Sequence, residues 1–249
     1  MTAEHLTIAW ICPELLGTYG DRGNVIALVS RARARAIPIR VVRVDAGQPV
    51  PESADIHILG GGEDLAQEEV ARQLGNDRGL RRAAEAGRVV FGVCAGYQLL
   101  GTSFVTHDGR TADGLGLLDI RSEHAARRAV GELLGTVPAP LSLPPVTGFE
   151  NHRGTTVLSG DTRPLARTMV GVGNGDGTEG GFHRHIMGTY LHGPALVRNP
   201  ALADLLLSWA TGGSLPVMND PWTEGLRSER LTALGHKPVT CIETEGAAK

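Results

Sequence analysis

The stretch from Val89 to Gly101 constrains the fold and the chemistry of this chain more than any other segment. It opens with a short apolar, β-branched run that predicts a buried strand, and the pattern after Cys94 is helical until Gly101. Gly92 and Gly96 flank the cysteine, and a glycine at position 96 lets the backbone turn sharply without a Cβ clash. A strand, a tight turn and a helix start predict a nucleophile elbow.

The elbow predicts a reactive thiol at Cys94. It places the sulfur near a helix N-terminus, where the helix dipole favours the thiolate over the thiol. The alternative from the local sequence is a buried structural cysteine at the end of a strand, because free cysteine is among the most buried residue types.

The composition limits the class of protein. A chain of 249 residues, 41% of them hydrophobic, can bury the core of one large α/β domain or two small ones. A net charge of −3 does not indicate general binding to nucleic acid or to a membrane surface. Cys12, Cys94 and Cys241 lie far apart without a CxxC pair, which is typical of a reducing cytoplasm rather than a disulfide or zinc framework. With neither a signal-peptide layout nor an apolar run of about 18 residues, we expect a cytoplasmic location.

Strands and helices alternate through the first half of the chain. The expected strands are 6–11, 39–44, 55–59 and 89–93, and the expected helices are 24–35, 65–74 and 79–86. This order predicts an α/β fold with a mostly parallel central sheet, helices on both faces and ligands at the C-terminal ends of the strands. After Gly101, short β-like pieces and turns predict an additional small antiparallel β region.

The second half of the chain contains one more strand expected in the central sheet, and its last residues show no clear hydrophobic periodicity. A final strand is expected at 186–191, followed by a helix over 200–211 with proline at its first position and glycine after its end. We therefore expect a domain over residues 1–212 and a C-terminal tail over 213–249 that is partly helical or disordered.

A glycine run and a histidine lie where a thiolate enzyme needs them. Gly60 to Gly62 follow the third strand and expose backbone N–H groups, which suits an oxyanion-binding loop, although a tight strand-to-helix connection is the alternative. A thiolate nucleophile also needs a base that can protonate the leaving group. Among nine histidines, His192 is the best placed because it follows a buried-looking strand. A lone histidine there is usually structural, so its pairing with Cys94 and the glycine run carries the catalytic interpretation.

The motifs in these positions carry a family resemblance. They are Gly60-Gly61-Gly62, Gly92-Val93-Cys94-Ala95-Gly96-Tyr97-Gln98 and Gly188-Thr189-Tyr190-Leu191-His192-Gly193-Pro194. In this order they resemble a class I, triad-type glutamine amidotransferase domain with a flavodoxin-like fold, and more narrowly its cobyric-acid-synthase-like branch.

Further stretches resemble one group within that branch, the glutaminase subunits of lipid II isoglutaminyl synthases. These are Tyr19-Gly20-Asp21-Arg22-Gly23-Asn24, Gly114-Leu115-Gly116-Leu117-Leu118-Asp119, Gly148-Phe149-Glu150-Asn151-His152 and His192-Gly193-Pro194. The resemblance covers about residues 6 to 211.

The resemblance implies a mechanism. The Cys94 thiolate attacks the side-chain amide carbon of L-glutamine, and His192 protonates the departing ammonia and then activates water. Backbone N–H groups of Gly61 or Gly62 and of Ala95 hold the tetrahedral oxyanion.

The resemblance also implies an arginine that grips the α-carboxylate of the substrate, since a guanidinium matches a carboxylate. Arg128 fits this role best and Arg127 is the fallback, with a solvated arginine pair on a surface turn as the alternative.

The chain departs from the class I pattern at one position. Many of these domains carry an acidic residue two positions after the histidine, where this chain has Pro194, and the cobyric-acid-synthase-like branch shares this lack. Another group must therefore orient His192. Asp21 in the early loop is one candidate, and Glu14 is a weaker one.

The sequence contains no GxxxxGK[ST] loop, so we expect neither ATP nor a metal or other cofactor in this chain. The resemblance implies a heterodimer with a Mur-ligase-like subunit, MurT. That partner would use ATP and Mg²⁺ to activate the α-carboxyl of D-glutamate in the lipid II stem peptide, and ammonia from glutamine would convert it to D-isoglutamine in peptidoglycan biosynthesis. The alternatives are an amidotransferase serving another synthetase, such as a cobyric acid enzyme, a cysteine peptidase on the same architecture, or a non-catalytic subunit that supports a ligase.

Overall fold

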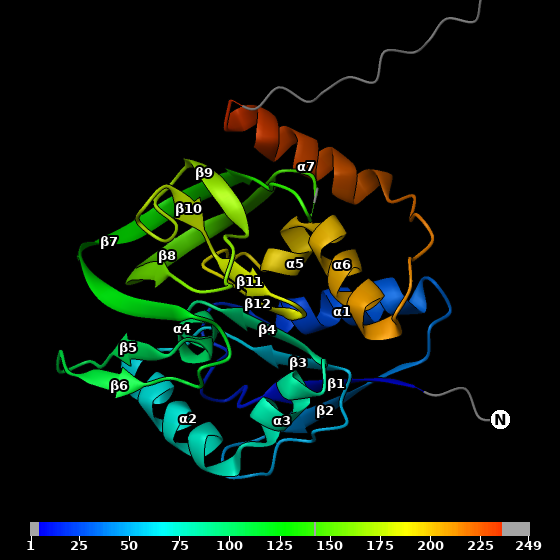
Figure 1. The fold of residues 1–249 in the computed structure, drawn as a ribbon. Helices are drawn as coiled ribbons and strands as arrows, with labels where there is room; N and C mark the ends of the chain where they lie inside the picture. Colours follow the sequence, from blue (N-terminus) through cyan, green and yellow to red (C-terminus); the bar gives the residue numbers. More distant parts are fainter. Residues whose placement is uncertain (1–4, 142, 236–249) are drawn as a thin grey trace, which may run out of the picture. The chain divides into compact units, whose positions relative to one another are not determined.

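Five parallel strands and one antiparallel edge strand form the central sheet. They are β1 (Leu6–Ile11), β2 (Ile39–Val44), β3 (Ile56–Leu59), β4 (Val89–Val93), β11 (Gly181–His183) and β12 (Ile186–Thr189). The computed structural model describes residues 5–141 and 143–235, and the strands follow the order β11-β12-β4-β3-β1-β2 (Figure 1). Only β11 runs antiparallel to its neighbour. All residues of β3 and β4 are buried, as expected for inner strands of a parallel sheet.

Helices cover both faces of this sheet. They are α1 (Arg22–Arg33), α2 (Asp64–Asp77), α3 (Gly79–Glu85), α4 (Ala95–Leu100), α5 (Ala195–Arg198) and α6 (Pro200–Thr211). α1, α5 and α6 pack together on one side, and α2 and α3 lie on the other (Figure 1). The predicted mostly parallel sheet with helices on both faces is confirmed.

A second sheet occupies the middle of the chain. Its strands are β5 (Ser103–Val105), β6 (Thr111–Asp113), β7 (Ile120–Thr136), β8 (Val146–Leu158), β9 (Ala166–Val170) and β10 (Thr178–Glu179). The order is β10-β9-β7-β5-β6, and β8 pairs antiparallel with β7. This region is larger than predicted, because the polar residues after Ile120 continue a long strand with one solvent-facing side instead of forming a turn.

The β7–β8 ladder contains the irregularity that matters for the site. His124 pairs with Gly154 and Ala129 pairs with His152, so four residues of β7 lie opposite a single residue of β8. Such bulges interrupt the ladder and redirect side chains, often beside functional sites. Arg128 is the last of these four residues.

The chain divides into two compact units, Met1–Val217 and Met218–Lys249, whereas the sequence predicts a boundary after residue 212. In the second unit, α7 (Pro221–Ala233) begins with proline at its first position. The Asp220 side chain caps it by accepting the backbone N–H of Thr223 at 3.2 Å. Cys241 and the end of the predicted tail lie outside the described residues.

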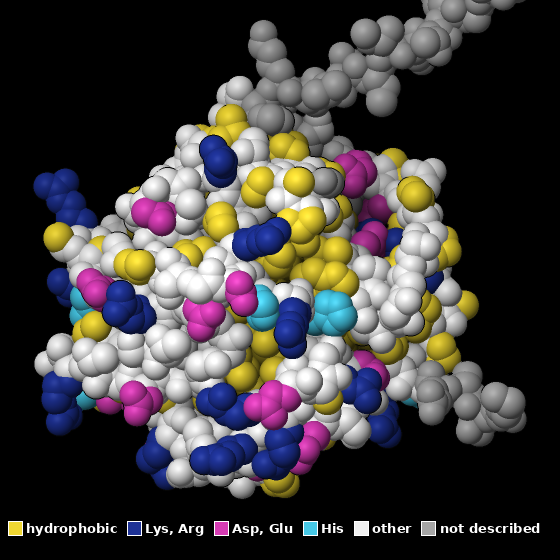
Figure 2. Space-filling view, viewed as in Figure 1, with side chains coloured by type: hydrophobic (Ala, Val, Ile, Leu, Met, Phe, Trp, Pro, Cys, Tyr) yellow, Lys and Arg dark blue, Asp and Glu magenta, His cyan; other side chains and the backbone are white. Residues whose placement is uncertain are grey.

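The surface mixes charges of both signs. On the face drawn in Figure 2, basic and acidic side chains are interspersed rather than gathered by sign. Among the described residues, no helix combines the length and apolarity needed to cross a bilayer.

Candidate active site

Cys94 sits between β4 and α4 with a strained backbone. Its φ of 52° and ψ of −106° lie in a region that L-residues rarely adopt. A Cβ on Gly92 would lie 2.6 Å from the carbonyl oxygen of Gly96, and a Cβ on Gly96 would lie 2.7 Å from that of Leu59. The predicted strand–turn–helix geometry is therefore present, but the physical reason differs from the expected one. The cysteine carries the positive φ, and the glycines permit close backbone packing.

The thiol of Cys94 is buried, and this burial decides its ionisation. Desolvation, with a further contribution from the Asp21 carboxylate, raises the pKa of Cys94 from 9.0 to about 12, although the backbone N–H of Ala95 acts in the opposite direction. The expectation that the helix start favours a thiolate is thus wrong. A helix as short as α4, with six residues, does not offset the loss of water around the sulfur.

His192 follows β12 and is held by backbone pairing with β8. Its N–H donates to the carbonyl oxygen of Phe149 at 2.8 Å, and the N–H of Phe149 donates back at 3.0 Å. The imidazole is buried, and neither of its nitrogens has a hydrogen-bond partner among the described residues. A buried imidazole with both nitrogens unpaired is costly, which is typical of a group kept for function.

Gly61 is the point where the predicted site residues meet. A Cβ at Gly61 would lie 3.0 Å from Cε1 of His192, 3.2 Å from Oδ2 of Asp21 and 3.5 Å from Cβ of Cys94. The structure therefore brings the cysteine, the histidine and the acid around one glycine. Gly60 to Gly62 all lack a positive φ, so the glycine run serves close packing rather than an unusual backbone conformation.

The backbone N–H of Gly61 has a partner that differs from its predicted role. It donates to Oδ2 of Asp21 at 2.6 Å, so in this structure it is engaged by a carboxylate instead of being directed at an oxyanion. Gly62 and Ala95, in contrast, line the pocket beside Cys94.

Asp21 lies beside His192, whereas Glu14 does not. The Asp21 carboxylate is fully buried, accepts from Nδ2 of Asn24 at 3.3 Å and lies 3.8 Å from Nδ1 of His192. Glu14 instead accepts the backbone N–H of Ala46 at 2.6 Å, in the connection after β2. Of the two candidates for orienting the histidine, the structure brings only Asp21 to it.

Pro194 stands two positions after the histidine and contacts the start of α1. A Cβ on Gly23 would lie 2.1 Å from Cγ of Pro194, so the first turn of α1, directly after Asp21, packs on the proline ring. The residue that replaces the usual acid thus helps to place another acid next to His192.

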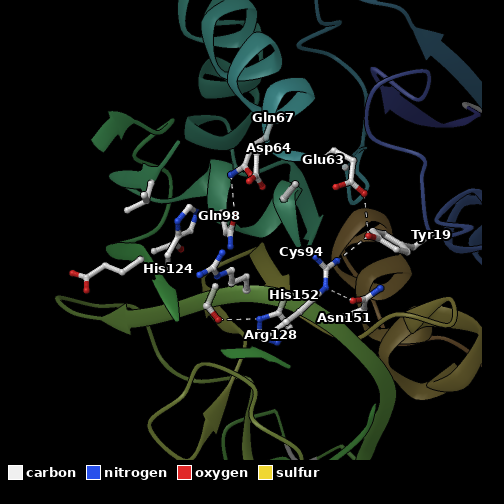
Figure 3. Close-up of a pocket in the computed structure, with 17 residues that line it drawn as sticks. Tyr19, Glu63, Asp64, Gln67, Cys94, Gln98, His124, Arg128, Asn151 and His152 are labelled. Atoms are coloured by element: carbon white, nitrogen blue, oxygen red, sulfur yellow. Dashed lines mark hydrogen bonds between the residues drawn. The ribbon is translucent and has the colours of Figure 1, made fainter. Parts of the chain in front are cut away.

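A polar pocket of about 180 Å³ opens above Cys94 (Figure 3). Arg128 lines it, and Arg127 does not. Nε of Arg128 donates to Oδ1 of Asn151 at 2.7 Å, and its Nη2 donates to the Tyr19 hydroxyl at 3.2 Å. The bulge in β7 thus aims the second arginine of the pair into the pocket.

Several pocket residues were not assigned a role from sequence. The Tyr19 ring packs on the imidazole of His192 with centroids 5.0 Å apart, and its hydroxyl donates to Oε1 of Glu63 at 3.1 Å. His152 lines the pocket and stacks on Tyr190 at 3.8 Å. Tyr19 and His152 lie in motifs that carry the family resemblance, so these motifs could have indicated both residues as part of the site. Glu63 lies in none of these motifs.

Within residues 5–141 and 143–235, no group of three or more histidine, cysteine, aspartate or glutamate side chains is arranged to hold a metal ion. The chemistry available in the pocket is that of a thiol, an imidazole, a buried carboxylate and backbone N–H groups. This set suits nucleophilic attack on a carbonyl carbon with proton transfer to a leaving group.

Comparisons with known proteins agree on the type of domain. The family described as CobB/CobQ-like glutamine amidotransferase domain matches residues 7–200. A solved structure of a glutamine amidotransferase aligns with 83% of this chain and 99% of its own, with a TM-score of 0.58 and 22% identity, which supports the fold.

Two relatives match most of their length. The Staphylococcus aureus (strain N315) protein named lipid II isoglutaminyl synthase (glutamine-hydrolyzing) subunit GatD is 36% identical over 83% of this chain and 85% of its own. The Streptococcus pneumoniae protein of the same name is 32% identical over 82% and 80%. A cobyric acid synthase from Sphingopyxis alaskensis is 35% identical over 68% of this chain, but only 34% of its own length is covered.

Proposed function

The chain belongs to the CobB/CobQ-like glutamine amidotransferase domain family, and from this premise we propose that it is the glutaminase subunit of a lipid II isoglutaminyl synthase. It hydrolyses L-glutamine through a thioester on Cys94 and delivers ammonia to an ATP-dependent ligase. The observation that carries the glutaminase chemistry is the meeting of Cys94, His192 and Asp21 around Gly61. The similarity to GatD subunits over 80% or more of their length supports the choice of acceptor.

The first half of the reaction releases ammonia. The Cys94 thiol gives its proton to His192, and the sulfur bonds to the side-chain amide carbon of glutamine while the C=O π electrons move to oxygen. When the tetrahedral adduct collapses, the C–N bond breaks and the nitrogen takes the proton from the imidazolium of His192. Ammonia leaves, and a γ-glutamyl thioester remains on Cys94.

The second half restores the enzyme. His192 accepts a proton from water as the water oxygen bonds to the thioester carbon. The C–S bond then breaks, glutamate leaves, and the proton on His192 returns to the Cys94 sulfur. Because burial holds the thiol in its protonated form, this mechanism requires the imidazole to act as a base in the first step.

The oxyanion of each tetrahedral adduct needs hydrogen-bond donors beside the Cys94 sulfur. We assign this role to the N–H groups of Ala95 and Gly62, because both residues line the pocket beside the sulfur and the N–H of Ala95 already donates to it. The loss of one such donor costs roughly 10²–10³ in rate. Gly61 acts indirectly in this scheme, because its N–H fixes the Asp21 carboxylate.

Asp21 supplies the negative charge that the imidazolium needs. A carboxylate beside a histidine favours the protonated ring and selects its orientation. We expect the 3.8 Å separation between Oδ1 of Asp21 and Nδ1 of His192 to shorten when the ring is charged. Arg128 binds the α-carboxylate of glutamine from the mouth of the pocket.

The ammonia acceptor lies on a partner protein in this proposal. A Mur-ligase-like subunit uses ATP and Mg²⁺ to activate the α-carboxyl of D-glutamate in the lipid II stem peptide, and ammonia converts it to D-isoglutamine. We place this heterodimer in the cytoplasm. The cobyric acid alternative is less favoured, because this chain covers only 34% of the length of such a synthase.

The test measures glutamate released from L-glutamine by the full chain, alone and with its Mur-like ligase, for the wild type and for Cys94→Ser. We expect release that disappears in the variant and rises with the ligase. Transfer of ¹⁵N from amide-labelled glutamine to lipid II, but not to a cobyrinate acceptor, tests the acceptor. Absence of glutamate release under both conditions would refute the glutaminase function.

A further inference from the structure

We infer that Glu63 receives the α-ammonium group of the substrate, so that Glu63 and Arg128 together select a free α-amino acid over amides that lack the ammonium group. This inference rests on the proposed glutaminase function and extends it to substrate selection. The ammonium site completes recognition of an amino acid, because a guanidinium alone would accept any carboxylate.

One hydroxyl group in the pocket, that of Tyr19, contacts both charged side chains. The Tyr19 hydroxyl donates to Oε1 of Glu63 at 3.1 Å and accepts from Nη2 of Arg128 at 3.2 Å. The carboxylate and the guanidinium therefore face the same oxygen atom at the mouth of the pocket (Figure 3). An α-amino acid carries its ammonium and carboxylate on one carbon atom, so it presents opposite charges at a similarly short separation.

Both side chains are aimed at the pocket by the fold. Arg128 leaves the bulge of β7 and is oriented by Asn151, which accepts from its Nε at 2.7 Å. Glu63 precedes the first residue of α2 and makes no capping hydrogen bond with its own helix, so its carboxylate is available to the pocket. Glu63 lies between β3 of the central sheet and α2, and Arg128 lies on β7 of the second sheet. The packing of these elements therefore fixes the position of the two charges relative to each other.

Other acidic side chains line the pocket but do not share this arrangement. Asp64 and Glu123 both lie in the lining. In the described part of the chain, neither carboxylate accepts a hydrogen bond from Tyr19 or Arg128, whereas Glu63 accepts one from the Tyr19 hydroxyl. The pairing with Arg128 across one hydroxyl distinguishes Glu63 as the ammonium acceptor.

Tyr19 and Glu63 also lie close enough to the catalytic residues for one glutamine molecule to reach both. Tyr19 packs on the His192 ring, and Gly62, the residue before Glu63, lines the pocket beside Cys94. A glutamine whose α-carbon groups replace the hydroxyl of Tyr19 at the mouth can extend its side chain toward Cys94. Recognition and reaction then occur at opposite ends of one small pocket.

The experiment compares two amides in the complex of the full chain with its ligase. L-Glutamine carries the α-ammonium group, and 4-carbamoylbutanoate is the same amide without it. For the wild type, we expect a preference for L-glutamine in kcat/KM of ammonia release. Glu63→Gln should lower kcat/KM for L-glutamine about tenfold or more, mainly through KM, and change the value for 4-carbamoylbutanoate less than twofold.

Two further variants separate this role from general charge effects. Glu69→Gln removes a carboxylate of α2 that lies outside the pocket and pairs with Arg72, and it should leave kcat/KM unchanged for both substrates. The assignment to Glu63 is wrong if Asp64→Asn rather than Glu63→Gln removes the preference for L-glutamine. It is also wrong if Glu63→Gln lowers kcat/KM equally for L-glutamine and 4-carbamoylbutanoate. A wild-type complex that releases no ammonia from L-glutamine would instead refute the proposed function itself.

Discussion

Oδ1 of Asp21 lies 3.8 Å from Nδ1 of His192, and both side chains are buried. The two residues are far apart in the chain. They meet where the first turn of α1, directly after Asp21, packs on Pro194, two positions after His192. This relationship offers an acid to a histidine that lacks the usual one two positions later. Its importance for turnover can be measured directly.

Replacement of Asp21 by asparagine tests this relationship. Asn can still accept the N–H of Gly61 but cannot stabilise a charged imidazole, so we expect kcat to fall about 10- to 100-fold. Unchanged turnover would leave Asp21 a purely structural role. The thermal midpoint serves as the folding control.

Gly61→Ala tests the crowding around the meeting point. The new methyl group would lie 3.0 Å from Cε1 of His192, closer than ordinary carbon contacts, so the imidazole must shift. We expect kcat to fall about 100-fold, because small displacements of catalytic groups are costly. Gly75→Ala on α2 is the matched control, since its added Cβ meets nothing within 4 Å and alanine favours the helix. Equal turnover in the two variants would contradict the predicted role of the packing at Gly61.

The arginine pair in β7 provides a comparison between neighbours. Arg128→Ala should raise KM for L-glutamine at least tenfold with a smaller change in kcat, because it removes a charge-assisted contact to the α-carboxylate. Arg127→Ala should change KM less than twofold, because Arg127 does not line the pocket. Arg128→Lys should lie between them, since an ammonium cannot make the two-pronged contact. Steady-state kinetics that show equal effects for Arg127 and Arg128 would remove the substrate role.

The parallel sheet and the elbow could be predicted because their signals are local. β4 is a continuous apolar run, and β3 is apolar except for His57. The glycines around Cys94 permit close backbone packing within the elbow and against the end of β3. The length of β7 could not be predicted in the same way. It faces solvent on one side and contains a bulge, so its polar residues give no continuous apolar run.

The pocket mouth could be predicted only in part. Tyr19 and Arg128 are separated by 109 positions, and the Tyr19 hydroxyl contacts both Arg128 and Glu63, which no local sequence pattern indicates. The ionisation of Cys94 was missed for a related reason. A helix start is visible in sequence, but the burial of the sulfur depends on the whole fold, and burial has the larger effect on its pKa.

The pKa of Cys94 leads to a prediction about its reactivity. Burial raises this pKa to about 12, so near neutral pH almost all of the thiol is protonated, and only the thiolate reacts with iodoacetamide. The rate of alkylation at Cys94 in the free chain should therefore rise about tenfold per pH unit between pH 7 and pH 10. Mass spectrometry of the Cys94 peptide measures this rate separately from Cys12, whose pKa burial raises to about 11.

The same measurement distinguishes two ways to activate the nucleophile. If His192 takes the thiol proton only when substrate or the ligase is present, alkylation of the free chain follows the steep pH dependence, and the added ligase accelerates it at fixed pH. If the rate in the free chain already levels off below pH 8, a thiolate–imidazolium pair exists before any partner binds. That outcome would contradict the protonated thiol, and His192→Ala should then restore the steep dependence, because the variant lacks the base that holds the proton.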